Sequence, residues 1–95
     1  IQGCVTSPQE FHDVGMWLLL AFGNIYPHLT LRDLQGHMKT SRQVGNFVRN
    51  TATPYPPFVE KYGLGKFVHC ILNYLDDFFG TISKEYANLQ FLTIA

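Results

Sequence analysis

Hydrophobic residues recur every three or four positions along most of the chain, which is the spacing of one face of an α-helix. In the first segment these positions are Phe11, Val14, Trp17, Leu18 and Ala21. A capping hydroxyl and a proline precede them in Thr6-Ser7-Pro8, and Gly23-Asn24 follows them. Because such residues favour the two ends of a helix, the pattern predicts a helix between Ser7 and Gly23.

A second helix is predicted from Thr30 to about Asn50. Thr30 and Asp33 have the spacing of a capping box, in which a hydroxyl and an acid three residues later satisfy each other's backbone N–H groups. Gly36 and Gly45 weaken this helix by about 1 kcal/mol each relative to alanine. Its apolar positions fall on one side and are Leu31, Leu34, Met38, Val44, Phe47 and Val48.

A proline-rich connector, Thr51–Pro57, ends this helix because proline cannot continue one. Phe58–Tyr62 is predicted to form a single turn, closed by Gly63. The most regular apolar spacing then runs from Leu64 to Phe79 and predicts a long helix that Gly80 stops.

Thr81 is placed to cap a final helix that carries Ile82, Tyr86, Leu89 and Leu92. Strand signals are few, and Phe91–Ile94 is the segment predicted to be extended. The expected fold class is therefore all-α, a compact bundle of four to five helices in a single helical domain covering residues 1–95.

Composition supports one packed domain rather than a disordered tail, since 46% of the 95 residues are hydrophobic and 15% are charged. The chain starts at Ile1 without a methionine, so a fragment of a longer protein is one interpretation.

Seven basic residues balance seven acidic ones. The sequence is therefore not a uniformly basic nucleic-acid-binding domain, and any such role depends on where the cations lie.

Cysteine usage and the apolar runs bear on the compartment. Cys4 and Cys70 lack CxxC spacing, which predicts free thiols in a reducing compartment. The longest apolar run, Met16–Phe22, is too short to span a bilayer, so no membrane partner is expected. It also lacks the basic lead and cleavage pattern of a signal peptide.

Catalytic and metal-binding patterns are weak. His69 and Cys70 are neighbours, and on a helix neighbouring side chains point about 100° apart. They are interpreted as a partly buried histidine beside a core cysteine. The four histidines have no HExxH spacing, and the Asp76-Asp77 pair has no calcium-binding loop around it. We therefore expect no enzyme activity, no catalytic residues, no metal site and no cofactor.

The basic residues carry more information. Arg32, Lys39, Arg42 and Arg49 all fall within a sector of about 100° along the predicted second helix, beside its apolar face. Such a stripe beside an apolar face can follow a phosphate backbone. An ordinary solvated helix face is the alternative interpretation.

A series of short motifs resembles the coat proteins of flexuous filamentous plant viruses. In chain order they are Thr6-Ser7-Pro8, Thr30-Leu31-Arg32, Arg49-Asn50, Pro-Tyr-Pro-Pro ending at Pro57, Tyr62-Gly63-Leu64 and Asp77-Phe78-Phe79. Their order is similar to that of potyvirus-like coat proteins, and potexvirus and carlavirus coat proteins have comparable motifs. The connector here is a few residues longer than in that family, and the stretch from Gly63 to Asp77 is slightly shorter.

The resemblance implies a virion subunit that polymerises with other copies of itself into a helical filament around single-stranded genomic RNA, in the host cytoplasm. In that family a serine, an arginine and an aspartate line the RNA groove. Matched by motif, these are Ser7, Arg32 and Asp77, with Asp76 as a competitor for the acid. Lys39, Arg42 and Arg49 complete the predicted RNA-binding set. The structural alternative for Arg32 and Asp77 is a buried ion pair.

A function of a different class also fits the sequence. The aromatic residues near the connector, Tyr55, Phe58 and Tyr62, together with the Leu64–Phe79 helix, could dock a partner helix. The chain would then be a small helical protein–protein interaction module without RNA binding.

Overall fold

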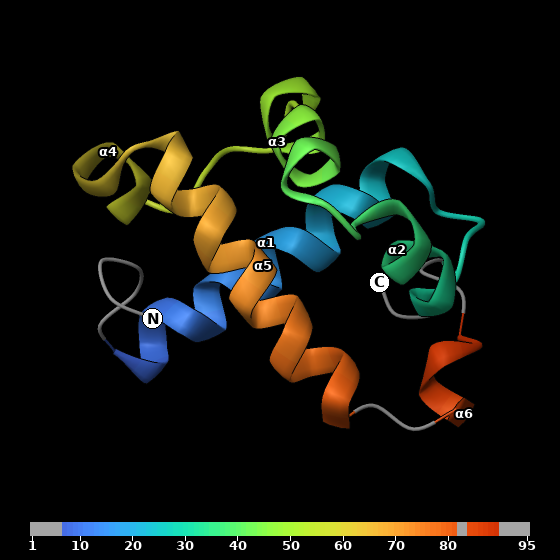
Figure 1. Ribbon diagram of the computed structural model, residues 1–95. Coiled ribbons are helices and arrows are strands. Elements are labelled where there is room, and N and C mark those ends of the chain that lie inside the picture. The colour runs from blue at the N-terminus through green and yellow to red at the C-terminus, as the bar shows by residue number, and fades with distance from the viewer. Residues whose placement is uncertain (1–6, 82–83, 90–95) are drawn as a thin grey trace.

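In the computed structural model, the chain is described over residues 7–81 and 84–89. Within those residues it forms six helices, four of which have seven or more residues (Figure 1). They are α1 (Pro8–Ile25), α2 (Leu31–His37), α3 (Ser41–Asn50), α4 (Phe58–Tyr62), α5 (Leu64–Thr81) and α6 (Lys84–Ala87). The predicted all-α class is confirmed. The extended segment predicted at Phe91–Ile94 lies outside the described residues.

Helix α1 begins where the sequence indicates. The Ser7 hydroxyl accepts a hydrogen bond from the backbone N–H of Glu10 at 3.1 Å, and Pro8 occupies the first helical position. The helix continues two residues beyond Gly23 and ends at Ile25, ahead of Pro27. Glycine and asparagine therefore weaken the end of α1 without setting it.

The single helix predicted from Thr30 to Asn50 is wrong, because the chain breaks between His37 and Ser41 to give α2 and α3. Thr30 caps α2 with Asp33, as expected. A second capping box then starts α3: the Thr40 hydroxyl accepts from the Gln43 N–H at 3.1 Å, and Gln43 Oε1 accepts from the Thr40 N–H at 3.0 Å. These side-chain bonds satisfy backbone groups that a continuous helix would have paired, so they favour a new start.

The connector and α4 follow the prediction. Gly63 closes α4 with a φ of 85°, a left-handed conformation that glycine adopts without strain. Gly80, however, does not stop α5, which continues to Thr81. The Thr81 hydroxyl donates back to the Phe78 carbonyl at 3.0 Å and does not cap a further helix. Of the predicted final helix, only Lys84–Ala87 is described as helical, and Ile82 and Leu92 lie outside the described residues.

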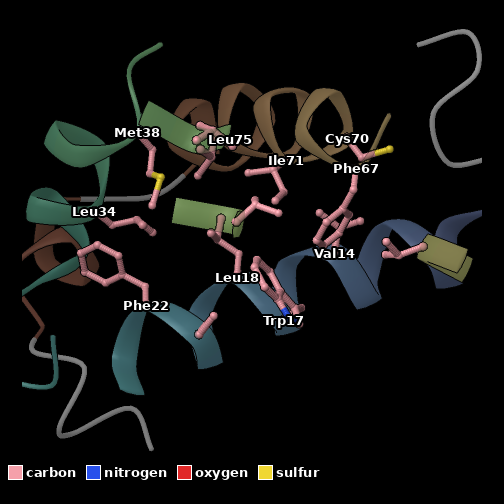
Figure 2. Close-up of a cluster of buried hydrophobic side chains, with 14 of the residues drawn as sticks. Val14, Trp17, Leu18, Phe22, Leu34, Met38, Phe67, Cys70, Ile71 and Leu75 are labelled. Atoms are coloured by element: carbon pink, nitrogen blue, oxygen red, sulfur yellow. The ribbon is translucent and has the colours of Figure 1, made fainter. Parts of the chain in front are cut away.

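The core lies where α1 and α3 pack on α5 (Figures 1 and 2). Its largest fully buried side chains are Phe22, Phe67, Leu18, Leu34, Ile71, Val14, Val44, Val48 and Cys70. The connector is fixed to this core by two hydrogen bonds. Trp17 Nε1 donates to the Thr53 carbonyl at 3.4 Å, and the Tyr55 hydroxyl donates to the Val48 carbonyl at 2.5 Å.

The close crossing of α1 and α5 depends on Gly15. A Cβ atom at this position would lie less than 3.0 Å from the ring of Tyr74. That ring is half-buried, stacks on Phe78 with centroids 5.5 Å apart and contacts Phe11 at 5.3 Å. Burial, with a smaller contribution from the charge of Asp77, raises the pKa of the Tyr74 hydroxyl.

The free-thiol prediction for Cys70 is wrong. Cys70 is 1% exposed and is disulfide-bonded, whereas Cys4 lies outside the described residues. His69, expected to be partly buried, is exposed. Since structural disulfides are typical of oxidising environments, cysteine usage no longer supports a reducing compartment.

As expected, no helix in the described part of the chain is long and apolar enough to cross a membrane.

Candidate functional site

The three residues that the family resemblance assigns to an RNA groove are not brought together within the chain. Ser7 caps the start of α1, while Arg32 lies on α2, beyond the other end of α1 (Figure 1). An 18-residue helix is about 27 Å long, so the two ends of α1 are far apart.

Arg32 and Asp77 are both exposed, and no salt bridge joins them. Arg32 donates instead to Oδ1 of Asn88, from Nε at 3.4 Å and from Nη2 at 3.3 Å. The buried ion pair considered as an alternative is therefore absent from these described residues. The charge of Asp77 acts on Tyr74, where it adds a smaller contribution than burial to the raised pKa of the hydroxyl.

Of the two neighbouring acids, Asp76 shares a groove with one of the predicted cations. Asp76 and Lys39 line the same open groove between α2 and α5, of about 440 Å³. Met38, Leu72 and Leu75 supply part of its apolar wall. The helix break places Lys39 between α2 and α3, away from any single cationic stripe.

A second cavity, of about 550 Å³, lies between the end of α1, the end of α2 and α3. We call it the amide cleft because three carboxamide side chains line it. Its lining residues are Ile25, Tyr26, His37, Met38, Gln43, Asn46, Phe47 and Asn50. The cleft therefore combines aromatic rings with three uncharged amides and one imidazole, and none of its lining residues is acidic.

Aromatic packing holds the rings of the cleft in place. Phe22, which is fully buried, contacts Tyr26 at 4.9 Å, His37 at 5.6 Å and Phe47 at 6.1 Å between ring centroids. The rings of Tyr26 and His37 are themselves 5.2 Å apart. Tyr26 and Phe47 are half-buried, so each keeps part of its ring surface accessible to a ligand.

When its imidazole ring is uncharged, His37 presents a hydrogen-bond acceptor to the cleft. Its Nδ1 lies 2.8 Å from the Asp33 carbonyl oxygen. A carbonyl can only accept, so Nδ1 carries the proton and the lone pair of the neutral ring is on Nε2. In the described part of the chain, Nε2 has no hydrogen-bond partner.

Two of the three amides in the cleft, Gln43 and Asn46, present donors because their oxygens are already occupied. Gln43 Oε1 accepts from the backbone N–H groups of Lys39, at 2.8 Å, and Thr40. Asn46 Oδ1 accepts from Arg49 Nη2 at 3.2 Å. The NH₂ groups of Gln43 and Asn46 remain for a ligand, and their spacing of three residues places both on one face of α3.

Exposed cations border these amides. Arg42 and Arg49 lie on α3 and are exposed, as is Lys39 just before it. The guanidinium of Arg49 folds over Gly45, where a Cβ atom would lie 3.2 Å from Nη2. Gly45 therefore gives Arg49 the room to approach Asn46.

His37, Gln43 and Asn46 were not among the site residues predicted from the sequence. One signal was present, since Thr40 and Gln43 have capping-box spacing. Recognising it would have placed the helix break at Met38–Thr40 and brought the end of α2 beside the first turns of α3.

Comparison with known proteins adds no assignment, because no family model, curated protein or solved structure matches this chain. The described residues also contain no group of three or more His, Cys, Asp or Glu side chains that could hold a metal ion. The amide cleft and the motifs of the sequence are therefore the features of this chain that point to a function.

Proposed function

We propose that this protein binds single-stranded RNA as the subunit of a helical coat, with the RNA running along α3. One observation carries the proposal: α3 holds the exposed cations Arg42 and Arg49, directly follows the exposed Lys39, and also lines a cleft with accessible aromatic rings. Proteins that bind single strands combine these two features, because cations follow the phosphates and flat rings stack on the bases.

The zero net charge of the chain is compatible with this role. Residues 39–50 contain three cations and no aspartate or glutamate, so this segment has a local charge of +3. Phosphate contacts depend on such local charge, because counterions are released only where cations meet the backbone. The acids are distributed elsewhere in the chain.

The remaining parts of the proposal rest on the resemblance to filamentous coat proteins. It assigns RNA contacts also to Ser7, Arg32 and Asp77, polymerisation with other copies of the chain, and a location in the virion and host cytoplasm. The Cys70 disulfide does not add support to the cytoplasmic part of this proposal. Arg32 is the best placed of the three, since its guanidinium is exposed and held by a neutral amide. An arginine in this state can form paired hydrogen bonds with a phosphate.

The test is binding of labelled, random-sequence single-stranded RNA, followed by fluorescence anisotropy at several salt concentrations. Each phosphate contact contributes a slope of about −0.7 to the dependence of log K on log salt concentration. Arg42→Gln should therefore weaken binding and make the slope shallower by about 0.7. Arg32→Ala should weaken binding in the same direction.

Lys66→Gln is the matched control, because Lys66 is an exposed cation in the first turn of α5 that lines neither cavity. It removes the same charge and should leave the slope unchanged. An equal effect of Lys66→Gln would indicate non-specific attraction, and no RNA binding at low salt would refute the proposal. Electron microscopy of the protein with RNA tests polymerisation through the presence of flexuous rods.

A protein–protein interaction module is the second candidate, and the surface that favours it differs from the predicted one. Tyr55 and Phe58 pack against the ring of Phe67 in the core. Met16 and Leu20, one turn apart on α1, are instead 55% and 58% exposed. If Met16→Ser/Leu20→Ser abolishes self-association measured by sedimentation without changing RNA affinity, this face serves protein contacts alone.

A further inference from the structure

We infer that the amide cleft binds one unpaired pyrimidine base, which its two amide donors and one imidazole acceptor recognise by hydrogen bonds. This inference rests on the proposed RNA-binding function and names the part of the RNA that the cleft selects. It concerns residues outside the set that the family resemblance assigns to the RNA groove.

The donor and acceptor arrangement of the cleft follows from the bonds already made within the protein. Gln43 and Asn46 have occupied oxygens and offer NH₂ donors. His37 has an occupied Nδ1 and offers the lone pair of Nε2. None of these three groups can change role without losing a hydrogen bond on its other side, so together they present two donor groups and one acceptor. The third amide, Asn50, and the Tyr26 hydroxyl also line the cleft and can each serve in either role.

The Watson–Crick edges of the pyrimidines match that set. Uracil presents two carbonyl oxygens and one N–H group, and cytosine presents O2, N3 and one amino group. Each base therefore supplies two acceptors and one donor group. Adenine offers only one acceptor on the same edge, and guanine only one. A purine on this edge leaves at least one of these three groups without a partner in the complex, and such a mismatch lowers the affinity for purines.

Stacking supplies affinity that does not depend on the base. Tyr26 and Phe47 present half-buried rings on the walls of the cleft, and the buried ring of Phe22 fixes both from below. Single-stranded RNA is recognised in this way, with unstacked bases placed on aromatic rings and hydrogen-bonded along their edges. Arg49, which holds Asn46, is placed to contact the adjacent phosphate.

The experiment compares labelled oligo(U), oligo(C) and oligo(A) of equal length at one salt concentration, again by anisotropy. The wild-type protein should bind the two pyrimidine oligomers about tenfold more tightly than oligo(A), the discrimination that one good paired contact provides. Gln43→Glu is the informative variant. It keeps Oε1 in the capping box of α3 and converts the NH₂ donor into an oxygen acceptor, so the fold is retained while the pyrimidine preference disappears.

Gln35→Glu is the matched control, since it adds the same charge at an exposed position of α2 outside the cleft. It should lower affinity for all three oligomers equally and leave their ratio unchanged. His37→Phe provides a second variant, because it keeps an aromatic ring and removes the acceptor. It should also reduce the preference for pyrimidines.

The outcomes separate this inference from the proposed function. Equal affinity of the wild type for the three oligomers, together with weaker binding by Arg42→Gln, overturns the pyrimidine site and leaves RNA binding intact. No binding of any oligomer at low salt overturns the proposed function. In that case a uridine titration followed by the ring-proton signals of His37 decides about the cleft: no shift overturns it, and a shift with uridine but not adenosine supports it.

Discussion

The packing of α1 against α5 predicts opposite effects for two glycine-to-alanine substitutions. At Gly15, an added Cβ atom would lie within 3.0 Å of ring atoms Cε2 and Cζ of Tyr74. The ring cannot move aside freely, because it stacks on Phe78 and contacts Phe11. At Gly36, in α2, an added Cβ atom would meet nothing within 4 Å.

The magnitudes follow from two opposing contributions. Alanine stabilises a helix interior by about 1 kcal/mol relative to glycine, and this applies at both sites. An extra methyl group in a tightly packed contact costs about 1–3 kcal/mol. Gly36→Ala should therefore raise the free energy of unfolding by up to about 1 kcal/mol, and Gly15→Ala should lower it by up to about 2 kcal/mol. For a domain of this size, each 1 kcal/mol shifts Tm by about 4–8 °C.

Thermal unfolding followed by circular dichroism at 222 nm measures both variants. A double-mutant cycle isolates the contact, because in a Tyr74→Ala background the ring is absent and Gly15→Ala should be stabilising, by about 1 kcal/mol. If Gly15→Ala raises the Tm of the wild-type protein as much as Gly36→Ala does, the close approach of α1 and α5 at this position is refuted.

Two further predictions concern acid and redox conditions. Hydrogen bonds from the Thr30 N–H and hydroxyl lower the pKa of Asp33 below 3.8, so its stabilising effect is complete above that pH and is lost as pH falls through the folded-state pKa. The urea concentration at the unfolding midpoint should therefore fall less between pH 5 and pH 2 in Asp33→Asn than in the wild-type protein. An equal fall in both proteins would contradict this role of Asp33. Reduction of the Cys70 disulfide should lower the free energy of unfolding by about 2–4 kcal/mol, and a Tm that does not respond to reductant would contradict its structural role.

The helix starts were predictable because they depend on neighbouring residues. Ser7 caps α1 and Thr30 caps α2 through hydrogen bonds that span three residues, and Gly63 closes α4 with a positive φ. Each of these interactions is local, so the sequence reports it directly. Helix ends were less predictable. Gly23 and Gly80 only lower helix propensity, and packing against the rest of the chain overrides that small cost.

The break between α2 and α3 was missed because the apolar pattern does not reveal it. Met38 and Val44 are both buried although the helix is interrupted between them. The same apolar positions are therefore compatible with two short helices and with one long helix. The difference between them is in the capping bonds of Gln43. Its Oε1 accepts three hydrogen bonds, from Lys39 and Thr40, and the two from backbone N–H groups replace bonds that a continuous helix would form.

That missed break is also what forms the candidate site. His37 ends α2, and Gln43 and Asn46 lie in the first two turns of α3, so these groups line one cleft only because the chain turns at Lys39 and Thr40. The Gln43 side chain serves both purposes: its oxygen caps α3, and the same bonds leave its NH₂ group for a ligand. A glutamate at this position would preserve the cap and remove the donor. Stability and base preference can therefore be separated at a single terminal atom, which makes position 43 the strongest test of whether the cleft has a role beyond folding.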